Sequence, residues 1–290
     1  MRRKVIGAVI ITIGLLIALS PFIITKLQSE NFSKTISEYE QIIDNTDNDE
    51  LAKDLEEAKR YNEYISTGLD SDDKGNYYDL LYYGAQGEMG YISIPDQNIN
   101  LPIYHGTSDE VLAKGIGHME ETSLPIGGES THCVLVGHTG LSYAMFDNIQ
   151  EMKNGDKFYI TVQDKVRTYK VISVEKVSAT DTELINIVQG KDLVSLVTCV
   201  QGLGNERLVV TGEAISEETS TETVIENITT EDNKSDFKEN ISTDQASIHQ
   251  LILIIAIALV FAAGIFIFTV RYKKSRKEKN ANESENSDKG

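Results

Sequence analysis

The residue with the clearest capacity for chemistry is a cysteine that ends an apolar run. Cys199 closes the segment DLVSLVTC, and the Gly-containing segment VQGLGN follows it. A thiol at the junction of a strand and a turn is held rigidly yet can meet a substrate, and its thiolate is a strong nucleophile. A free cysteine is also commonly a small buried hydrophobe. The residues alone leave both interpretations of Cys199 open.

An arginine begins the next apolar run. Arg207 lies in the segment ERLVVTGE, which has the composition of a strand. If the two runs form a hairpin, Arg207 can lie across from Cys199. A guanidinium group there would hold a substrate or stabilise an oxyanion, because its charge and its fork of N–H donors are fixed. The alternative for Arg207 is a solvated surface charge.

Histidine is the usual partner of a nucleophilic thiol because it exchanges protons near neutral pH. His138 follows an apolar strand and is flanked by glycines in the segment VGHTG, which predicts an accessible ring. His105 also ends a strand-like run, and His118 lies in a predicted Gly-rich turn. His132 lies inside a strand and is predicted to be structural. The residues do not select among His105, His118 and His138.

The sequence predicts neither a metal site nor a structural disulfide. The histidines form no close ligand pair, and the two cysteines, Cys133 and Cys199, form no CxxC motif. Cys133 lies within an apolar strand and is expected to pack in the core. The chain has 45 acidic and 27 basic residues, a formal net charge of −18. This acid excess argues against nucleic-acid binding, which needs surplus Lys and Arg.

The elements that would position these residues lie in the middle of the chain. Residues 88–215 contain short runs rich in Val, Ile, Thr and Tyr, bounded by turn residues, which predicts a mainly β barrel or sandwich. The runs are MGYISIP, INLPIYH, THCVLVGH, KFYITV, RTYKVISVEKV, LVSLVTCV and RLVVTGE. Residues 26–87 are predicted to be a helical extension, helical over 27–66, followed by a polar loop that serves as a linker or lid.

Two uncharged apolar segments, residues 5–24 and 251–270, are each long enough to span a bilayer. The first segment could instead be a signal peptide, but its apolar run is long and no clear cleavage site follows it. Basic residues flank the outer ends of both segments, in the N-terminal region 1–25 and in the tail 271–290. The positive-inside rule therefore places both termini in the cytoplasm and the middle of the chain outside. The acidic, polar residues 216–247 predict a disordered stalk before the second membrane region, 248–270.

Residues 89–213 resemble a class C, or pilin-polymerising, sortase. The motif SLVTC at residues 195–199 is similar to that family's Thr-Leu-X-Thr-Cys signature, with Ser195 in place of the first Thr. Further segments resemble the family in the same order: MGYISIP, LPIYHGT, GIGH, TSLPIGG and THCVLVGHTGL. The predicted arrangement of two membrane anchors is also typical of class C.

The resemblance implies a closed β-barrel of about eight strands that acts as a cysteine transpeptidase. Cys199 matches the family's nucleophile, His138 its general acid/base, and Arg207 the arginine that stabilises the substrate or oxyanion. The implied reaction cleaves a Leu-Pro-X-Thr-Gly-like sorting signal between Thr and Gly and transfers the acyl group to an amine. For class C this amine is a lysine of a pilin subunit. The step needs no metal or organic cofactor.

Three departures from the class C pattern bear on specificity. The lid motif Asp-Pro-aromatic is missing, since none of the four prolines follows an aspartate, so residues 67–83 are a loose lid or a linker. The loop after Cys199 differs from the family's Thr-Pro-Tyr type, and Thr139 stands where an arginine is common. Wall anchoring through a cell-wall amine, and a hydrolytic or purely binding relative, are the alternative functions.

Overall fold

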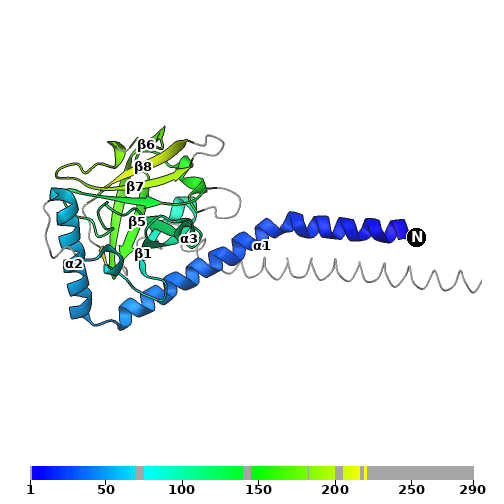
Figure 1. The fold of residues 1–290 in the computed structure, drawn as a ribbon, viewed down its shortest axis with the longest axis horizontal. Coiled ribbons are helices and arrows are strands. Elements are labelled where there is room, and N and C mark those ends of the chain that lie inside the picture. Colours follow the sequence, from blue (N-terminus) through cyan, green and yellow to red (C-terminus); the bar gives the residue numbers. More distant parts are fainter. Residues whose placement is uncertain are drawn as a thin grey trace, which may run out of the picture. The chain divides into compact units, whose positions relative to one another are not determined.

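The structure is a computed structural model that describes residues 2–68, 75–139, 145–181, 183–199, 205–215 and 219–220. Its fold divides into two compact units, residues 24–227 and residues 1–23 with 228–290. The first unit holds a β-barrel and the helices that pack on it (Figure 1). The described part of the second unit, residues 2–23, is helical.

Two long helices precede the strands. They are α1 (Arg2–Asn45) and α2 (Asn48–Thr67). The strands are β1 (Glu88–Ile94), β2 (Ile99–His105), β3 (Ile116–His118), β4 (Thr131–Val136), β5 (Lys157–Val162), β6 (Lys165–Ser178), β7 (Asp192–Cys199), β8 (Glu206–Ala214) and β9 (Thr219–Ser220). Short helical turns lie between them: η1 (Tyr77–Asp79), η2 (Pro95–Gln97), α3 (Asp109–Leu112), η3 (Asp147–Glu151) and η4 (Glu183–Ile185).

Eight of these strands close into a barrel. Their order is β5-β1-β2-β3-β4-β7-β8-β6, and the pairing of β5 with β6 joins the two ends. Closure leaves no free sheet edge among these strands. The predicted barrel of about eight strands is therefore confirmed. The two-residue strand β9, which falls in the predicted stalk, pairs with Lys165 and Val166 of β6. The rest of the stalk lies outside the described residues.

Alternation along the strands separates the barrel interior from its outer face. On β7, Val194 and Leu196 join the main core, whereas Val197 belongs to a second, smaller cluster. That cluster also contains Val134 of β4 and Val209 of β8. We call these three residues the valine cluster. Alternate positions of β4, β7 and β8 therefore face outward.

The predicted helical region, 27–66, is confirmed except for a break at Thr46 and Asp47. Asp47 caps α2, because its side chain accepts a hydrogen bond from the N–H of Asp49. Gly68 ends α2 in the left-handed conformation, at φ 65°. The sequence did not predict the break, because good helix formers surround it on both sides. The asparagine and aspartate residues near it favour helix caps as well as loops.

Buried polar groups fix both helices to the barrel. The Tyr39 hydroxyl of α1 accepts a hydrogen bond from the N–H of Gln163 at 2.7 Å and donates to the carbonyl of Met89. The Asn62 side chain of α2 exchanges two hydrogen bonds with the backbone of Leu124. Burial strengthens the requirement for these bonds, since an unpaired buried polar group is costly. The helical extension is thus integral to the folded unit.

The chain between α2 and β1 docks on the barrel through Tyr77. Its hydroxyl lies 2.8 Å from Nδ1 of His118 and 3.0 Å from the carbonyl oxygen of the same residue, and it accepts from the N–H of Gly106. Tyr77 is 5% exposed, and its ring contacts those of His105 and His118. Within the predicted lid or linker, 67–83, residues 69–74 lie outside the described residues.

Replacement of Tyr77 by phenylalanine is expected to destabilise the folded unit by about 1–3 kcal/mol, because the ring stays while buried partners lose their hydrogen bonds. Urea unfolding of the full-length chain measures this loss. The matched control is Tyr78→Phe, since Tyr78 is 50% exposed and its hydroxyl contacts Glu120 at the surface. Equal stability of the two variants would show that the Tyr77 hydroxyl does not hold the segment.

The predicted membrane segments stay predictions. Among the described residues, none of the helices combines the length and the apolar content needed to cross a membrane. The second segment, 251–270, lies outside the described residues.

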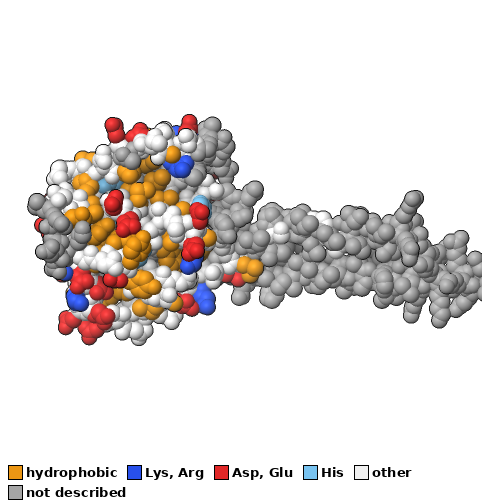
Figure 2. Space-filling model, in the orientation of Figure 1, with side chains coloured by type: hydrophobic (Ala, Val, Ile, Leu, Met, Phe, Trp, Pro, Cys, Tyr) orange, Lys and Arg blue, Asp and Glu red, His pale blue; other side chains and the backbone are white. Residues whose placement is uncertain are grey.

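On the face of the molecule shown in Figure 2, acidic side chains are more prominent than basic ones, in keeping with the formal net charge of −18.

Candidate active site

The predicted hairpin neighbours are confirmed at the level of the backbone. β7 and β8 pair antiparallel, and their register sets Cys199 directly opposite Arg207. Arg207 also pairs with Val177 of β6 and is half-buried. Its Nη1 donates a hydrogen bond to the carbonyl of Glu206 at 3.1 Å. The side chain of Cys199 and residues 200–204 lie outside what the structure describes.

His138 reaches the same end of the sheet from β4. β4 runs parallel to β7, with Val136 opposite Val197. One residue further on, the N–H of Gly137 donates to the carbonyl of Val197 at 3.0 Å. His138 follows directly and is half-buried. The backbone at 138, 199 and 207 therefore comes together at one end of three adjacent strands.

Strand alternation places Arg207 on the outer face of the barrel. Val209 belongs to the outward-facing valine cluster, so Arg207, two residues before it on β8, continues the same outward series. Ile185 of η4 packs against the valine cluster from the β6–β7 connection. The outer face thus offers an apolar floor immediately beside the positions predicted to carry the chemistry.

A side-chain hydrogen bond joins β7 to β4, and the sequence motif alone does not reveal it. The buried hydroxyl of Thr198 donates to the carbonyl of Gly137 at 2.7 Å. Gly137 cannot carry a side chain, because a Cβ there would lie 2.5 Å from the ring of Phe146. The N–H of Phe146 in turn donates to the carbonyl of His138. These contacts fix the backbone on both sides of the histidine relative to the end of β7.

The variant Thr198→Val should lower kcat by about 10-fold or more, since small displacements of catalytic groups are costly. Valine has nearly the same shape, but it leaves the carbonyl of Gly137 without this donor. Thr198→Ser retains the hydroxyl and is expected to keep most of the activity. Turnover of a sorting-signal peptide by the two variants measures the difference. If serine and valine cost the same, the hydroxyl has no positioning role.

Two of the candidate histidines are structural. His118 was predicted to lie in a turn, and this prediction is wrong: it lies on β3 and is fully buried. Its Nε2 lies 2.8 Å from the carbonyl oxygen of Ser123, and its Nδ1 faces Tyr77. His105 is 8% exposed, with Nε2 2.7 Å from the carbonyl oxygen of Leu80. Burial lowers the pKa of both imidazoles. Of the three candidates, His138 alone is partly exposed.

Burial lowers the pKa of His118 to about 4, whereas the unfolded chain titrates near 6.5. Below about pH 6.5 the unfolded chain gains a proton that the folded chain excludes, so the free energy of unfolding falls as the pH drops toward 4. The full loss is about 3 kcal/mol. Urea unfolding of the wild type and of His118→Gln at pH 7 and pH 5 tests this. Parallel losses in the two proteins would contradict it.

His132 and Cys133 are buried, as their place inside a strand predicted. His132 is 1% exposed and Cys133 is 2% exposed. Burial raises the pKa of the Cys133 thiol, and this cysteine is free of any disulfide. Cys133 faces the main core rather than the outer face. Within the part of the chain that the structure describes, no three His, Cys, Asp or Glu side chains are grouped so that they could hold a metal ion.

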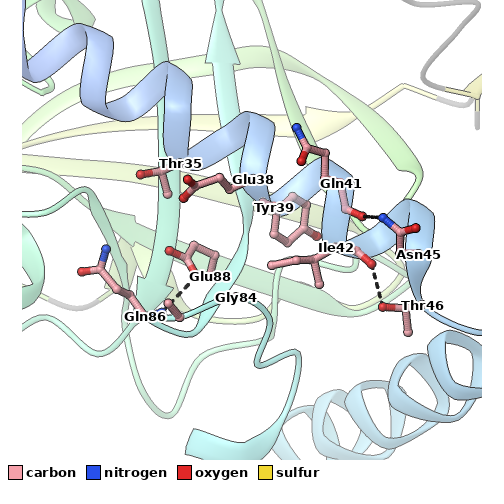
Figure 3. Close-up of a pocket in the computed structure, with 11 residues that line it drawn as sticks. Thr35, Glu38, Tyr39, Gln41, Ile42, Asn45, Thr46, Gly84, Gln86 and Glu88 are labelled. Atoms are coloured by element: carbon pink, nitrogen blue, oxygen red, sulfur yellow. Dashed lines mark hydrogen bonds between the residues drawn. The ribbon is translucent and has the colours of Figure 1, made fainter.

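A separate pocket lies where α1 meets the turn before β1 (Figure 3). Its volume is about 540 Å³, and its lining includes Tyr39 and Ile42 of α1, Gly84 of the turn and Glu88, the first residue of β1. Figure 3 shows Glu88 between α1 and the turn, where its carboxylate accepts a hydrogen bond from the N–H of Gln86. None of the predicted catalytic residues lines this pocket. It is a junction of helix and barrel, distinct from the site at the ends of β4, β7 and β8.

Comparison with known proteins agrees with the barrel fold. The sortase domain family matches residues 92–215. The structure of sortase C1 from Streptococcus agalactiae is 38% identical, with a TM-score of 0.60, and the match covers 63% of this chain and 99% of that one. Sortase C from Clostridium perfringens, solved with the C-terminal cell wall sorting motif, is 38% identical with a TM-score of 0.58, covering 64% of this chain and 100% of that one.

The chain therefore belongs to the sortase family, and its resemblance to class C sortases is confirmed. Sortase C from Streptococcus pneumoniae is a further similar structure, at 32% identity and a TM-score of 0.58, with 64% of this chain and 98% of that chain covered. Among curated relatives, sortase A of Streptococcus agalactiae is 36% identical over 129 residues. That match spans 43% of this chain and 52% of the relative, or about half its length.

Proposed function

We propose that this protein is a cysteine transpeptidase that cleaves a sorting signal of the Leu-Pro-X-Thr-Gly type and transfers the acyl group to an amine. One observation carries the proposal: positions 138, 199 and 207 lie at the same end of three adjacent strands, β4, β7 and β8. A nucleophile, a proton carrier and a fixed cation side by side suffice for acyl transfer.

In the first half of the reaction, the thiolate of Cys199 attacks the carbonyl carbon of the signal's threonine. The carbonyl oxygen gains negative charge, which the guanidinium of Arg207 stabilises. His138 then gives a proton to the leaving nitrogen of glycine, and the C–N bond breaks. The products are a thioester on Cys199 and a free glycyl amine.

In the second half, an incoming amine attacks the thioester. His138 takes the proton that the amine loses, and the C–S bond breaks to restore the thiolate of Cys199 and the protonated His138 with which the first half began. Dividing the transfer into two steps replaces one difficult displacement by two easier ones. The atoms balance without a metal or organic cofactor. The apolar floor formed by the valine cluster suits the leucine and proline of the signal.

We further propose that the acceptor amine is a lysine of a pilin subunit. The support is the likeness to sortase C structures, among them that of the pneumococcal sortase C, which bears on pilin substrate specificity. The enzyme would act outside the cell membrane, held by two helices with both termini in the cytoplasm. This location is supported by the uncharged segments 5–24 and 251–270 and the basic residues that flank them.

Incubation of the full-length chain in detergent with a sorting-signal peptide and a lysine-bearing acceptor peptide tests the proposal. Mass spectrometry is expected to detect a product in which the signal's threonine is joined by an amide to the lysine. Adding glycine-based amines in a parallel reaction compares cell-wall-like acceptors with lysine. Cleaved peptide without joined product would replace the transpeptidase by a hydrolase, and intact peptide would argue for a binding protein.

A further inference from the structure

A buried polar network lies two rungs below the active-site end of β7. Nε2 of His132 is 2.9 Å from the hydroxyl oxygen of Ser195, which is 3.0 Å from that of Thr211. Nδ1 of His132 is 2.8 Å from the backbone carbonyl oxygen of Asn186. The three side chains are buried, and they come from β4, β7 and β8. The network thus joins the three strands of the site to the β6–β7 connection, residues 179–191.

The chemistry of the partners fixes the state of the imidazole. The carbonyl of Asn186 can only accept, so Nδ1 of His132 carries a hydrogen. In the neutral ring Nε2 then has a lone pair and accepts from the hydroxyl of Ser195, which accepts in turn from Thr211. Burial lowers the pKa of His132, which favours this neutral form. Every polar atom of the ring has a partner, and one of them belongs to the loop.

The His132 bond holds the middle of the loop. At its two ends the loop is tied to the barrel, by the N–H of Ala179 to the carbonyl of Asn205 and by the N–H of Gly190 to the hydroxyl of Ser130. Between these ends, Asn186 accepts from His132, and the adjacent Ile185 packs against the valine cluster. The hydrogen bond therefore keeps Ile185 seated beside the apolar floor.

His132 lies too far from position 199 to take part in the chemistry. Ser195, its partner on β7, is four residues before Cys199, a separation of about 13 Å along an extended strand. A group at that distance acts by positioning other groups. A loop that is already ordered beside the floor loses less conformational entropy when a peptide binds next to it.

We infer that His132 is a positioning residue that anchors the β6–β7 connection through Asn186 and thereby sets the affinity for the sorting signal. The inference rests on the proposed function, because it assigns the residue to that same site. Loss of the anchor raises KM for the signal peptide and leaves the bond-breaking steps nearly unchanged, since the ends of β4 and β7 are fixed to each other separately by Thr198 and Gly137.

Two variants of the full-length chain isolate the loop bond. His132→Ala removes both ring contacts, whereas His132→Asn keeps an N–H donor near the position of Nδ1 and loses the contact with Ser195. In the alanine variant we expect amide hydrogen exchange of residues 183–188 to become about 10-fold faster and KM to rise about 10-fold, with kcat within about 3-fold of the wild type. The asparagine variant is expected to stay near the wild type in both measurements.

A third variant, Ser195→Ala, separates the loop bond from the rest of the network. It removes the partner of Nε2 but leaves Nδ1 facing Asn186, so exchange in residues 183–188 should stay within about 3-fold of the wild type. Unfolding curves of all three variants show whether each one folds. A KM that rises equally in the alanine and asparagine variants, or a loss that falls on kcat, overturns the inference.

Different results would refute the anchoring role of His132 and the proposed function. A wild-type chain that does not turn over the signal peptide refutes the proposed function and the claim on affinity together. A wild-type chain that is active, with unchanged loop exchange in His132→Ala, refutes the anchor alone. Faster exchange with an unchanged KM likewise refutes the link between the loop and affinity.

Discussion

Replacement of Cys199 by alanine is expected to abolish both cleavage and transfer of a sorting-signal peptide. The thiolate forms the covalent bond on which both halves of the reaction depend, and methyl cannot replace it. Loss of a nucleophile from a catalytic set lowers kcat on the order of 10³-fold or more. A timed assay of peptide cleavage and of amide-linked product, with the full-length variant, measures this loss.

Cys133→Ala provides the matched control for the other cysteine. Cys133 is buried on the core side of β4, and burial raises the pKa of its thiol, so it is a poor nucleophile. We expect this variant to remain active, with a modest loss of stability from the small cavity. Activity that persists in Cys199→Ala and disappears in Cys133→Ala would show that the nucleophile is misassigned.

Replacement of Arg207 is expected to have the next largest effect. Arg207→Ala should lower kcat/KM roughly 10²–10³-fold, because it removes a donor to the developing oxyanion. Arg207→Lys keeps the charge and is expected to recover only part of this loss, since lysine lacks the planar fork of N–H donors. The register that sets Arg207 opposite Cys199 gives the charge its place.

Arg167→Lys is the control for a general effect of replacing arginine. Arg167 lies on β6 opposite Ile160 of β5, at the far end of that strand from Val177, which pairs with Arg207. Steady-state kinetics of the variants at positions 167 and 207 separate the two cases. Full activity of Arg207→Lys would mean that charge alone is needed there, and full activity of Arg207→Ala would remove this residue from the mechanism.

The strands of the site were predictable because they are long and apolar. β7 and β8 stand out as runs rich in Val, Leu and Thr, and the sequence left a hairpin between them as a condition that the structure fulfils. The pairing of Cys199 with Arg207 follows from that hairpin. β3 was missed, because it has three residues and includes a glycine. Its presence is set by pairing with β2 and β4, which a local pattern does not reveal.

The choice among the histidines depended on tertiary contacts. His105, His118 and His138 all stand beside glycines or at strand ends, and their local sequences are similar. The structure separates them because Tyr77, from a distant segment, covers His118 and contacts His105. The resemblance of the segment around His138 to the sortase motif selected this histidine where residue patterns alone left three candidates open.

The hydrogen bond between Thr198 and Gly137 gives the threonine of the motif a structural role that its sequence position alone does not reveal. A threonine before the cysteine reads as one more β-branched strand residue. Its hydroxyl becomes meaningful when β4 is known to lie parallel beside β7, with Gly137 within reach. A parallel pairing between segments 61 residues apart in sequence cannot be inferred from either segment by itself.

Trapping of the acyl-enzyme is the most direct test that Cys199 is the nucleophile of a transpeptidase. The full-length chain is incubated with a sorting-signal peptide without an acceptor amine, digested at low pH, and analysed by mass spectrometry. We expect the signal, ending at its threonine, to be attached to the peptide that contains Cys199. Cleavage of the signal with Cys199 unmodified, or attachment at Cys133, would contradict it.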